Sequence, residues 1–149
     1  LALAADIRLC APSAKFVVSF IRGGLSGCDV GVSHLLPRIV GLGMASEIML
    51  TGRHVGAEEA VRIGLANRIV PEGESVVDAA IELGREIARN SPFAVRMTKQ
   101  VLHRNVDAPS LEAAIELENR TQVVATRTQD MSEALNAFIE KRDPVYSGL

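Results

Sequence analysis

The sequence contains no tryptophan, and aromatic residues of all kinds make up 3% of its 149 residues. Aromatic platforms for stacking nucleic-acid bases are therefore not expected. The formal net charge is -2, and the 16 basic residues are scattered along the chain instead of forming a cluster. Neither a nucleic acid nor an acidic membrane surface is an expected partner, because both require a basic patch.

Cysteine and histidine are also scarce. The two cysteines, Cys10 and Cys28, form no CxxC pattern, and the histidines His34, His54 and His103 lie far apart, so no metal site is expected. Two isolated thiols are typical of a reducing compartment, and we expect a cytoplasmic protein. No apolar run reaches the roughly 18 residues of a membrane span, and no basic leader opens the chain, so neither a membrane anchor nor a signal peptide is expected.

The most informative stretch is Phe16–Gly41, FVVSFIRGGLSGCDVGVSHLLPRIVG. β-Branched and aromatic residues predict a strand through residues 15–21, and glycines then allow a sharp turn. Asp29 follows the glycines and precedes an apolar helix predicted over residues 30–40. Asp29 is either a helix N-cap with a purely structural role or the carboxylate of a loop site.

The rest of the chain alternates short extended pieces with helices, which indicates an α/β protein. Asp6–Cys10 is a predicted strand, but no later strand is expected to complete its sheet, so both early strands should pair outside this sequence. The sequence also lacks an initiator Met, and we expect an N-terminal segment that completes the fold. Four helices are predicted after residue 75. Ser91-Pro92 is a helix start, and Asp130 is the predicted cap of the last helix.

Several phrases together resemble the crotonase superfamily of enoyl-CoA hydratases and isomerases. They are LALAADIRLCAPSAKF at 1–16, LPRIVGLGMASEIMLTGR at 36–53, AEEAVRIGLANRIV at 57–70, SPFAVRMTKQVL at 91–102 and EALNAFIEKRDPVY at 133–146. They match the family's C-terminal part only. The resemblance implies an α/β fold of repeated β-β-α turns, with its last strands in residues 1–70, and a helical trimerisation and CoA-contact region in residues 71–149.

The resemblance also implies an acyl-CoA thioester as substrate, no cofactor, and a homotrimer or a hexamer made of two trimers. The family stabilises a thioester enolate with two backbone N–H groups, and both would lie before Leu1. Its hydratases use two glutamates, of which the second would fall at Phe20, and phenylalanine cannot transfer a proton. Dienoyl-CoA isomerases of the family carry an Asp in D-V-G before L-P-K, which matches Asp29-Val30-Gly31.

The last helix carries a second match. Family members use Phe and Lys of A-F-x-E-K-R to contact CoA, which implies this role for Phe138 and Lys141. The alternative is that Phe138 is a core residue and Lys141 a solvated cation at a helix end. The resemblance therefore implies an enoyl-CoA hydratase of fatty acid metabolism, with Asp29 as the candidate catalytic residue. An enoyl-CoA or dienoyl-CoA isomerase and a catalytically silent acyl-CoA-binding protein are the alternatives.

Overall fold

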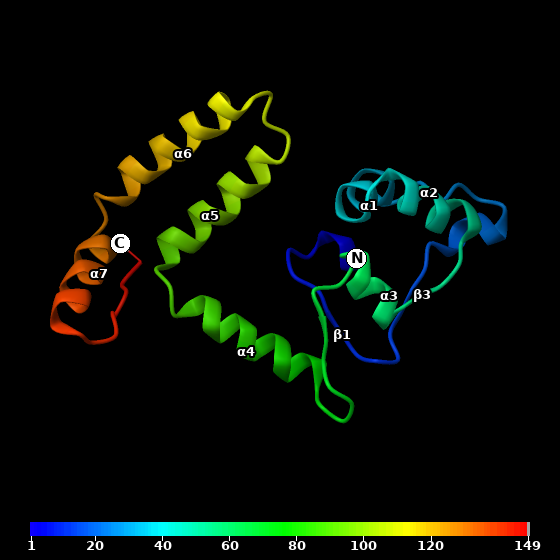
Figure 1. Cartoon of the computed structure of the whole chain (residues 1–149), viewed down its shortest axis with the longest axis horizontal. Coiled ribbons are helices and arrows are strands. Elements are labelled where there is room, and N and C mark those ends of the chain that lie inside the picture. Colours follow the sequence, from blue (N-terminus) through cyan, green and yellow to red (C-terminus); the bar gives the residue numbers. More distant parts are fainter. Residues whose placement is uncertain (149) are drawn as a thin grey trace. The chain divides into compact units, whose positions relative to one another are not determined.

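A computed structural model describes residues 1–148 of the chain, which forms two compact units (Figure 1). The first unit comprises residues 1–82 and the second begins at Leu83. In the described residues no helix is both long and apolar enough to cross a membrane. The resemblance implies a different division, into a core region of residues 1–70 and a trimerisation and CoA-contact region of residues 71–149. That division concerns function and stays a prediction.

The first unit holds all the strands of the described chain. Its elements are η1 (Ala2–Ala4), β1 (Leu9–Cys10), β2 (Lys15–Phe16), η2 (Ser19–Gly23), α1 (Val32–Val40), α2 (Leu42–Thr51), β3 (Val55–Gly56), α3 (Ala57–Arg62) and β4 (Arg68–Ile69), where η denotes a 3-10 helix. The expectation that the early strands find no partner in this sequence is wrong. β1 pairs with β4 in parallel, and β2 pairs with β3 in antiparallel orientation.

Arg8 links the residues that precede β1 and β4, at the end of the parallel pair where both strands begin. Its backbone N–H donates to Asn67 Oδ1 at 2.8 Å, and its Nε donates to the Leu65 carbonyl at 2.6 Å. The core of the first unit is formed by buried side chains from its helices and strands, among them Leu36, Ile48 and Val55. Alternating short strands and helices thus produce one packed α/β core.

The strand predicted over residues 15–21 is wrong beyond Phe16. Residues 19–23 form η2 instead, which ends at Gly24 in the left-handed region with φ 78°. β-Branched side chains favour strands only where a partner strand is available. β3 offers two residues, so the chain leaves the sheet after Phe16 and buries Val18 against the core.

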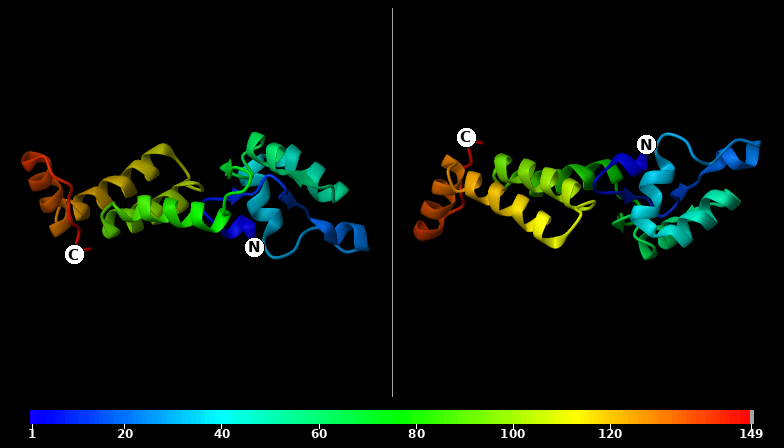
Figure 2. Two further views of the ribbon diagram at one scale, coloured as in Figure 1. Left: turned by 90° about the horizontal axis from the view of Figure 1, so that it is seen from below. Right: turned by 90° about the horizontal axis from the view of Figure 1, so that it is seen from above.

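The second unit is helical apart from the chain that follows its last helix (Figure 2). α4 (Val76–Ala88) leads into it, followed by α5 (Pro92–Asn105), α6 (Leu111–Ala125) and α7 (Gln129–Glu140). The predicted start of α5 is confirmed, because Ser91 Oγ accepts a hydrogen bond from the Ala94 N–H at 3.2 Å. α5 and α6 lie side by side as a helical hairpin.

The predicted cap of α7 is wrong. Thr128 is the N-cap, and its Oγ1 accepts from the Met131 N–H at 3.2 Å. Asp130 lies in the first turn instead and turns its carboxylate toward Ser91. Both Thr and Asp are good cap residues, so the choice between them depends on contacts far away in the sequence.

Candidate functional site

Asp29 lies on the loop between η2 and α1, and its side chain is exposed. The interpretation of Asp29 as a helix cap is wrong, because Gly31 is the N-cap of α1 and no side chain caps that helix. The Asp29 backbone carbonyl accepts a hydrogen bond from the Val32 N–H at 2.9 Å. Within residues 1–148 its carboxylate has no hydrogen-bond or ion-pair partner.

The backbone after Asp29 is strained. Val30 has a φ of 41° and Gly31 a φ of 83°, so two consecutive residues occupy the left-handed region before the helix begins. A β-branched residue there is a genuine outlier, and Val30 is also largely exposed. Such strain persists where the surroundings enforce it and is concentrated at functional sites.

Close packing against α2 fixes the start of this loop. A Cβ added to Gly27 would lie 3.3 Å from the Met49 carbonyl oxygen, and one added to Gly52 would lie 2.7 Å from Ile21 Cγ2. The Leu25 N–H donates to the Phe20 carbonyl at 3.1 Å, which closes η2. The end of α2 therefore determines where η2 and the following loop lie.

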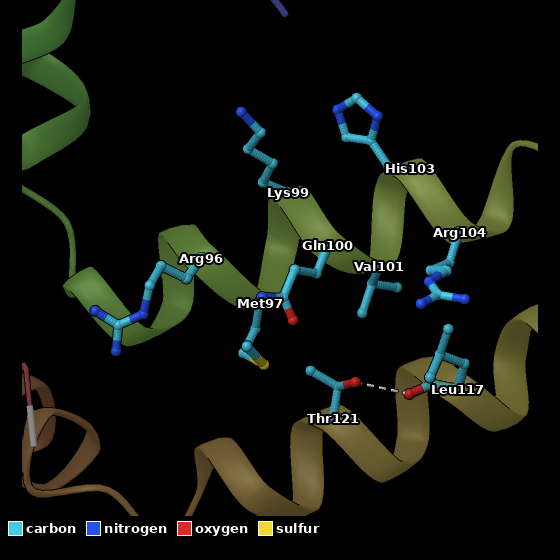
Figure 3. Close-up of a pocket in the computed structure, with 9 residues that line it drawn as sticks. All are labelled: Arg96, Met97, Lys99, Gln100, Val101, His103, Arg104, Leu117 and Thr121. Atoms are coloured by element: carbon cyan, nitrogen blue, oxygen red, sulfur yellow. Dashed lines mark hydrogen bonds between the residues drawn. The ribbon is translucent and has the colours of Figure 1, made fainter.

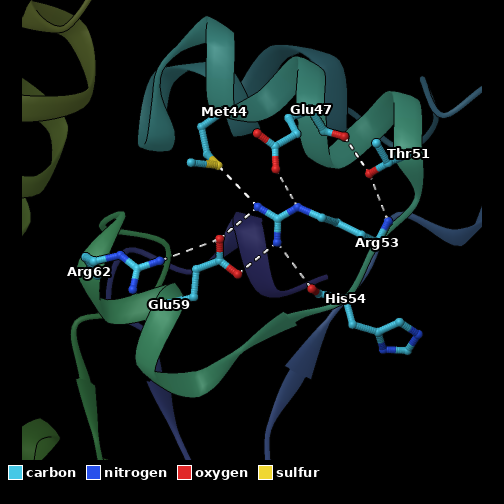
Figure 4. A network of polar contacts seen from close by, with 7 residues as sticks. All are labelled: Met44, Glu47, Thr51, Arg53, His54, Glu59 and Arg62. Atoms are coloured by element: carbon cyan, nitrogen blue, oxygen red, sulfur yellow. Dashed lines mark hydrogen bonds and ion pairs between the residues drawn. The ribbon is translucent and has the colours of Figure 1, made fainter.

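Arg53 connects α2 to α3 through a network that the sequence analysis missed (Figure 4). Its Nη1 and Nη2 each donate to a Glu59 oxygen at 2.8 Å, and its Nε donates to Glu47 Oε1 at 2.7 Å. The hydrogen bonds from Arg53 hold the pKa of the Glu59 carboxyl below its usual range. The sequence pattern that could have indicated this network is Arg53 itself, which lies six residues from a glutamate on either side. The network holds α2 and α3 together.

Phe138 and Lys141 lie on and just after the last turn of α7, in the second unit. Phe138 is 82% exposed, so it is not a core residue of this chain. Lys141 is exposed and forms the C-cap of α7 with a left-handed φ of 55°. The predicted contact pair is thus adjacent and accessible, whereas Asp29 belongs to the other unit.

The chain after Lys141 is bound to the start of α7 at two points. Glu133 receives the Arg142 guanidinium, with Nη1–Oε1 at 2.6 Å and Nη2–Oε2 at 3.0 Å. Asp130 is 2% exposed and accepts from Ser91 Oγ at 2.6 Å and from the Ser147 N–H at 2.8 Å. The pKa of Asp130 is lowered mainly by the hydrogen bond from the Ser91 hydroxyl. The backbone N–H groups of Gly148 and Ser147 lower it further.

An open groove of about 1030 Å³ runs between α5 and α6 (Figure 3). Met97, Val101 and Leu117 lie between the two helices, whereas Lys99 and His103 point away from α6. No carboxylate is among the groove-lining residues, so the groove offers no acid–base pair. In residues 1–148 no three potential metal ligands of the His, Cys, Asp or Glu type form a group that could hold a metal ion.

Comparison with known proteins identifies relatives along the whole described chain. The family model described as enoyl-CoA hydratase/isomerase matches residues 1–148. A probable enoyl-CoA hydratase of Mycobacterium tuberculosis is 45% identical over 148 residues, covering 99% of this chain and 52% of its own length. The short-chain-enoyl-CoA hydratase of Clostridium acetobutylicum is 33% identical, with 95% and 53% covered.

The relatives also include an isomerase and a protein of known crystal structure. The 1,2-epoxyphenylacetyl-CoA isomerase of Escherichia coli K12 is 35% identical, covering 99% of this chain and 55% of its own. The crystal structure of a putative enoyl-CoA hydratase from Streptomyces coelicolor superposes with a TM-score of 0.93 at 44% identity, over 100% of this chain and 54% of that one. The chain spans about half the length of the relatives it matches.

Proposed function

Because the chain belongs to the enoyl-CoA hydratase/isomerase family, we propose that its protein is an enzyme that acts on acyl-CoA thioesters. Hydration of an enoyl-CoA is the first candidate activity, in fatty acid metabolism and in the cytoplasm. The observation that carries the proposal is Asp29, an exposed carboxylate on a strained loop with no partner in the described chain. A carboxylate in this state can accept or donate a proton without first losing a structural bond.

Isomerisation is the second candidate, and Phe20 favours it. The resemblance implies that Phe20 replaces the second glutamate of the family's hydratases, and the residue is 43% exposed on η2. A two-glutamate hydration mechanism would lack its second glutamate at this position. Asp29 would then move a proton at the α or γ carbon of the thioester, or orient water.

CoA recognition falls to Phe138 and Lys141 in this proposal. The exposed Phe138 ring offers an apolar face, and an ammonium is a compact point charge that suits a phosphate. The substrate itself is the acyl-CoA, and the proposal includes no separate cofactor or metal.

Assembly into a trimer, or into two stacked trimers, is the quaternary part of the proposal. α6 and α7 leave large apolar side chains exposed, among them Val123, Leu135 and Ile139. A helix face of this kind is covered in a stable protein, and a further copy or the remainder of the protein would cover it. Sedimentation of the intact protein as a monomer at micromolar concentration would contradict the trimer.

The decisive experiment is Asp29→Asn in the intact protein, assayed for hydration of a 2-enoyl-CoA and for isomerisation of a 3-enoyl-CoA. Removing a positioned proton-transfer group should lower turnover about 10²- to 10⁴-fold. Because Asp29 does not cap α1, unfolding free energy should change by less than about 0.5 kcal/mol. Asp78→Asn, which alters an exposed carboxylate on α4, is the matched control and should keep full turnover.

The two reactions separate the candidates. If Asp29→Asn abolishes only isomerisation, the isomerase is the correct assignment. If both reactions keep full turnover, Asp29 is not catalytic and the proposed role is wrong. If the unaltered protein binds acyl-CoA but turns over neither substrate, it is the silent binding protein.

A further inference from the structure

Two consecutive cations at the end of α7 have opposite surroundings. The Arg142 guanidinium is fully engaged, with Glu133 on one side and its Nε donating to Glu140 Oε2 at 2.6 Å on the other. The Lys141 ammonium is exposed and has no hydrogen-bond or ion-pair partner in the part of the chain that the structure describes. The Arg142 side chain therefore has a structural role, whereas the Lys141 ammonium can bind an anion.

The backbone at Lys141 is in a conformation that its residue type disfavours. Its φ of 55° lies in the left-handed region, where a helix C-terminus normally carries glycine. A residue with a side chain stays there only if the surrounding structure enforces the conformation. The neighbouring contacts must therefore supply the constraint.

Those contacts belong to residues 142–148, which we call the C-terminal strap and which return along α7 in Figure 1. Next to Lys141, the Arg142 N–H donates to the Ala137 carbonyl at 3.0 Å. Glu133 then receives both the Arg142 side chain and the Val145 N–H, the latter at 2.8 Å. One carboxylate near the start of α7 thus holds the strap at two points, both of which follow Lys141.

A second anchor holds the far end of the strap. Asp130 Oδ1 accepts from the Ser147 N–H at 2.8 Å and from the Gly148 N–H at 3.0 Å, and its other oxygen is bound to Ser91. This anchor ties the strap to the start of α5. Glu133 holds the strap closer to Lys141 than this anchor does, because it binds Arg142, the next residue in the chain.

We propose that Glu133 and Arg142 are positioning residues for Lys141. Their ion pair fixes the chain reversal at which the Lys141 ammonium stays exposed and unpaired, so that it is preorganised for a phosphate of CoA. This inference rests on the CoA contact that the proposed function assigns to Lys141. The pair persists at neutral pH, because Arg142 lowers the pKa of Glu133 to about 2.

The test is a double-mutant cycle on CoA binding to the intact protein, measured by calorimetry. Lys141→Ala removes the phosphate contact and should raise the dissociation constant for CoA about 10- to 100-fold. Arg142→Gln should raise it about three- to tenfold, because an ordered contact becomes mobile. In the Lys141→Ala background, Arg142→Gln should change it less than twofold, since a positioning residue has nothing left to position.

Three controls accompany the cycle. Glu133→Gln keeps an oxygen that can accept from Val145, and it repeats the cycle with a milder change should Arg142→Gln not fold. Arg120→Gln breaks the exposed pair with Glu116 on α6 and should leave CoA binding unchanged. Pantetheine lacks the nucleotide phosphates, so its binding should respond to none of these variants.

The outcomes separate the two claims. If Lys141→Ala leaves CoA binding unchanged, the CoA contact of the proposed function is overturned, and the positioning role with it. If Lys141→Ala weakens binding but Arg142→Gln and Glu133→Gln do not, only the positioning role is overturned. Equal weakening by Arg142→Gln with and without Lys141 would mean that the strap is merely structural, and this also overturns the inference.

Discussion

Replacing Gly52 by alanine should destabilise the first unit more than the loss of one glycine normally does. Gly52 ends α2 with a φ of 61°, and an added Cβ would lie 2.7 Å from Ile21 Cγ2 and 3.2 Å from the Val18 carbonyl oxygen. The Ile21 methyl group belongs to a side chain that can rotate, but the Val18 carbonyl is backbone and can yield only if η2 moves. Gly52→Ala therefore combines backbone strain with overpacking.

The magnitude follows from the two contributions. A left-handed alanine costs about 1–2 kcal/mol, and an added methyl group in a packed site about 1–3 kcal/mol. The substitution also restricts the unfolded chain, which returns about 0.4–1 kcal/mol. We expect a net loss of roughly 1–4.5 kcal/mol in unfolding free energy.

Gly73→Ala is the matched control, since Gly73 has a φ of 86° but an added Cβ would meet nothing within 4 Å. It should lose only the backbone part, about 1 kcal/mol. Urea unfolding of the intact protein, followed by circular dichroism, measures both variants. Gly52→Ala should also lower turnover about 10- to 100-fold, because displacing η2 moves the loop that carries Asp29. Equal stability losses at the two positions would refute the tight contact between η2 and the end of α2.

Two further predictions concern acid stability and thiol reactivity. The Arg142 guanidinium, and then the Val145 N–H, lower the pKa of Glu133 to about 2 from an ordinary value of about 4.3. The stability that Glu133 contributes is therefore full above about pH 4 and is lost as the pH falls through about 2. Glu133→Gln should flatten urea unfolding midpoints between pH 2 and 5, and an unchanged pH profile would contradict this. Cys28 is exposed, whereas Cys10 is buried and burial raises the pKa of its thiol, so Ellman's reagent should modify Cys28 but not Cys10 in the native protein, and urea should make Cys10 reactive too. Rapid modification of Cys10 without urea, located by peptide mass spectrometry, would count against its burial.

The fold class was predictable because the evidence for it was spread along the whole chain. The α/β crotonase-like assignment, restricted to the C-terminal part, is confirmed by structures that match the chain over about half of their own length. Helix ends marked by local chemistry were predictable too, such as the start of α5 at Ser91-Pro92. These signals depend on the few residues around them, and those residues are visible in the sequence.

Features set by distant contacts were not predictable. Asp130 resembles a cap, but the hydroxyl of Ser91, 39 residues earlier, binds its carboxylate. Phe20 follows β-branched residues, yet its segment packs as η2 against the end of α2. For Asp29, two left-handed residues move the start of α1 to Val32 and release the carboxylate from capping.

The candidate site was predictable only as a set of separate residues. The roles of Asp29, Phe138 and Lys141 stay predictions. The structure adds that all three are exposed and that Lys141 is held in an unfavourable backbone conformation. The structural roles of Arg53 and Arg142 could not be predicted from the sequence. These roles depend on which carboxylates lie next to the two guanidinium groups in the folded chain.

The pairing of β1 with β4 limits the order in which the first unit can fold. Arg8 and Asn67, which flank the two strands, are 59 residues apart in the sequence, so closing this loop costs chain entropy before any contact compensates for it. The α5–α6 hairpin joins neighbouring segments and has no comparable delay. During synthesis, β1 leaves the ribosome long before β4 exists and has to wait with an unpaired edge. β4, the last strand of the described residues, therefore completes the strand pair of the first unit only after the intervening helices have been made.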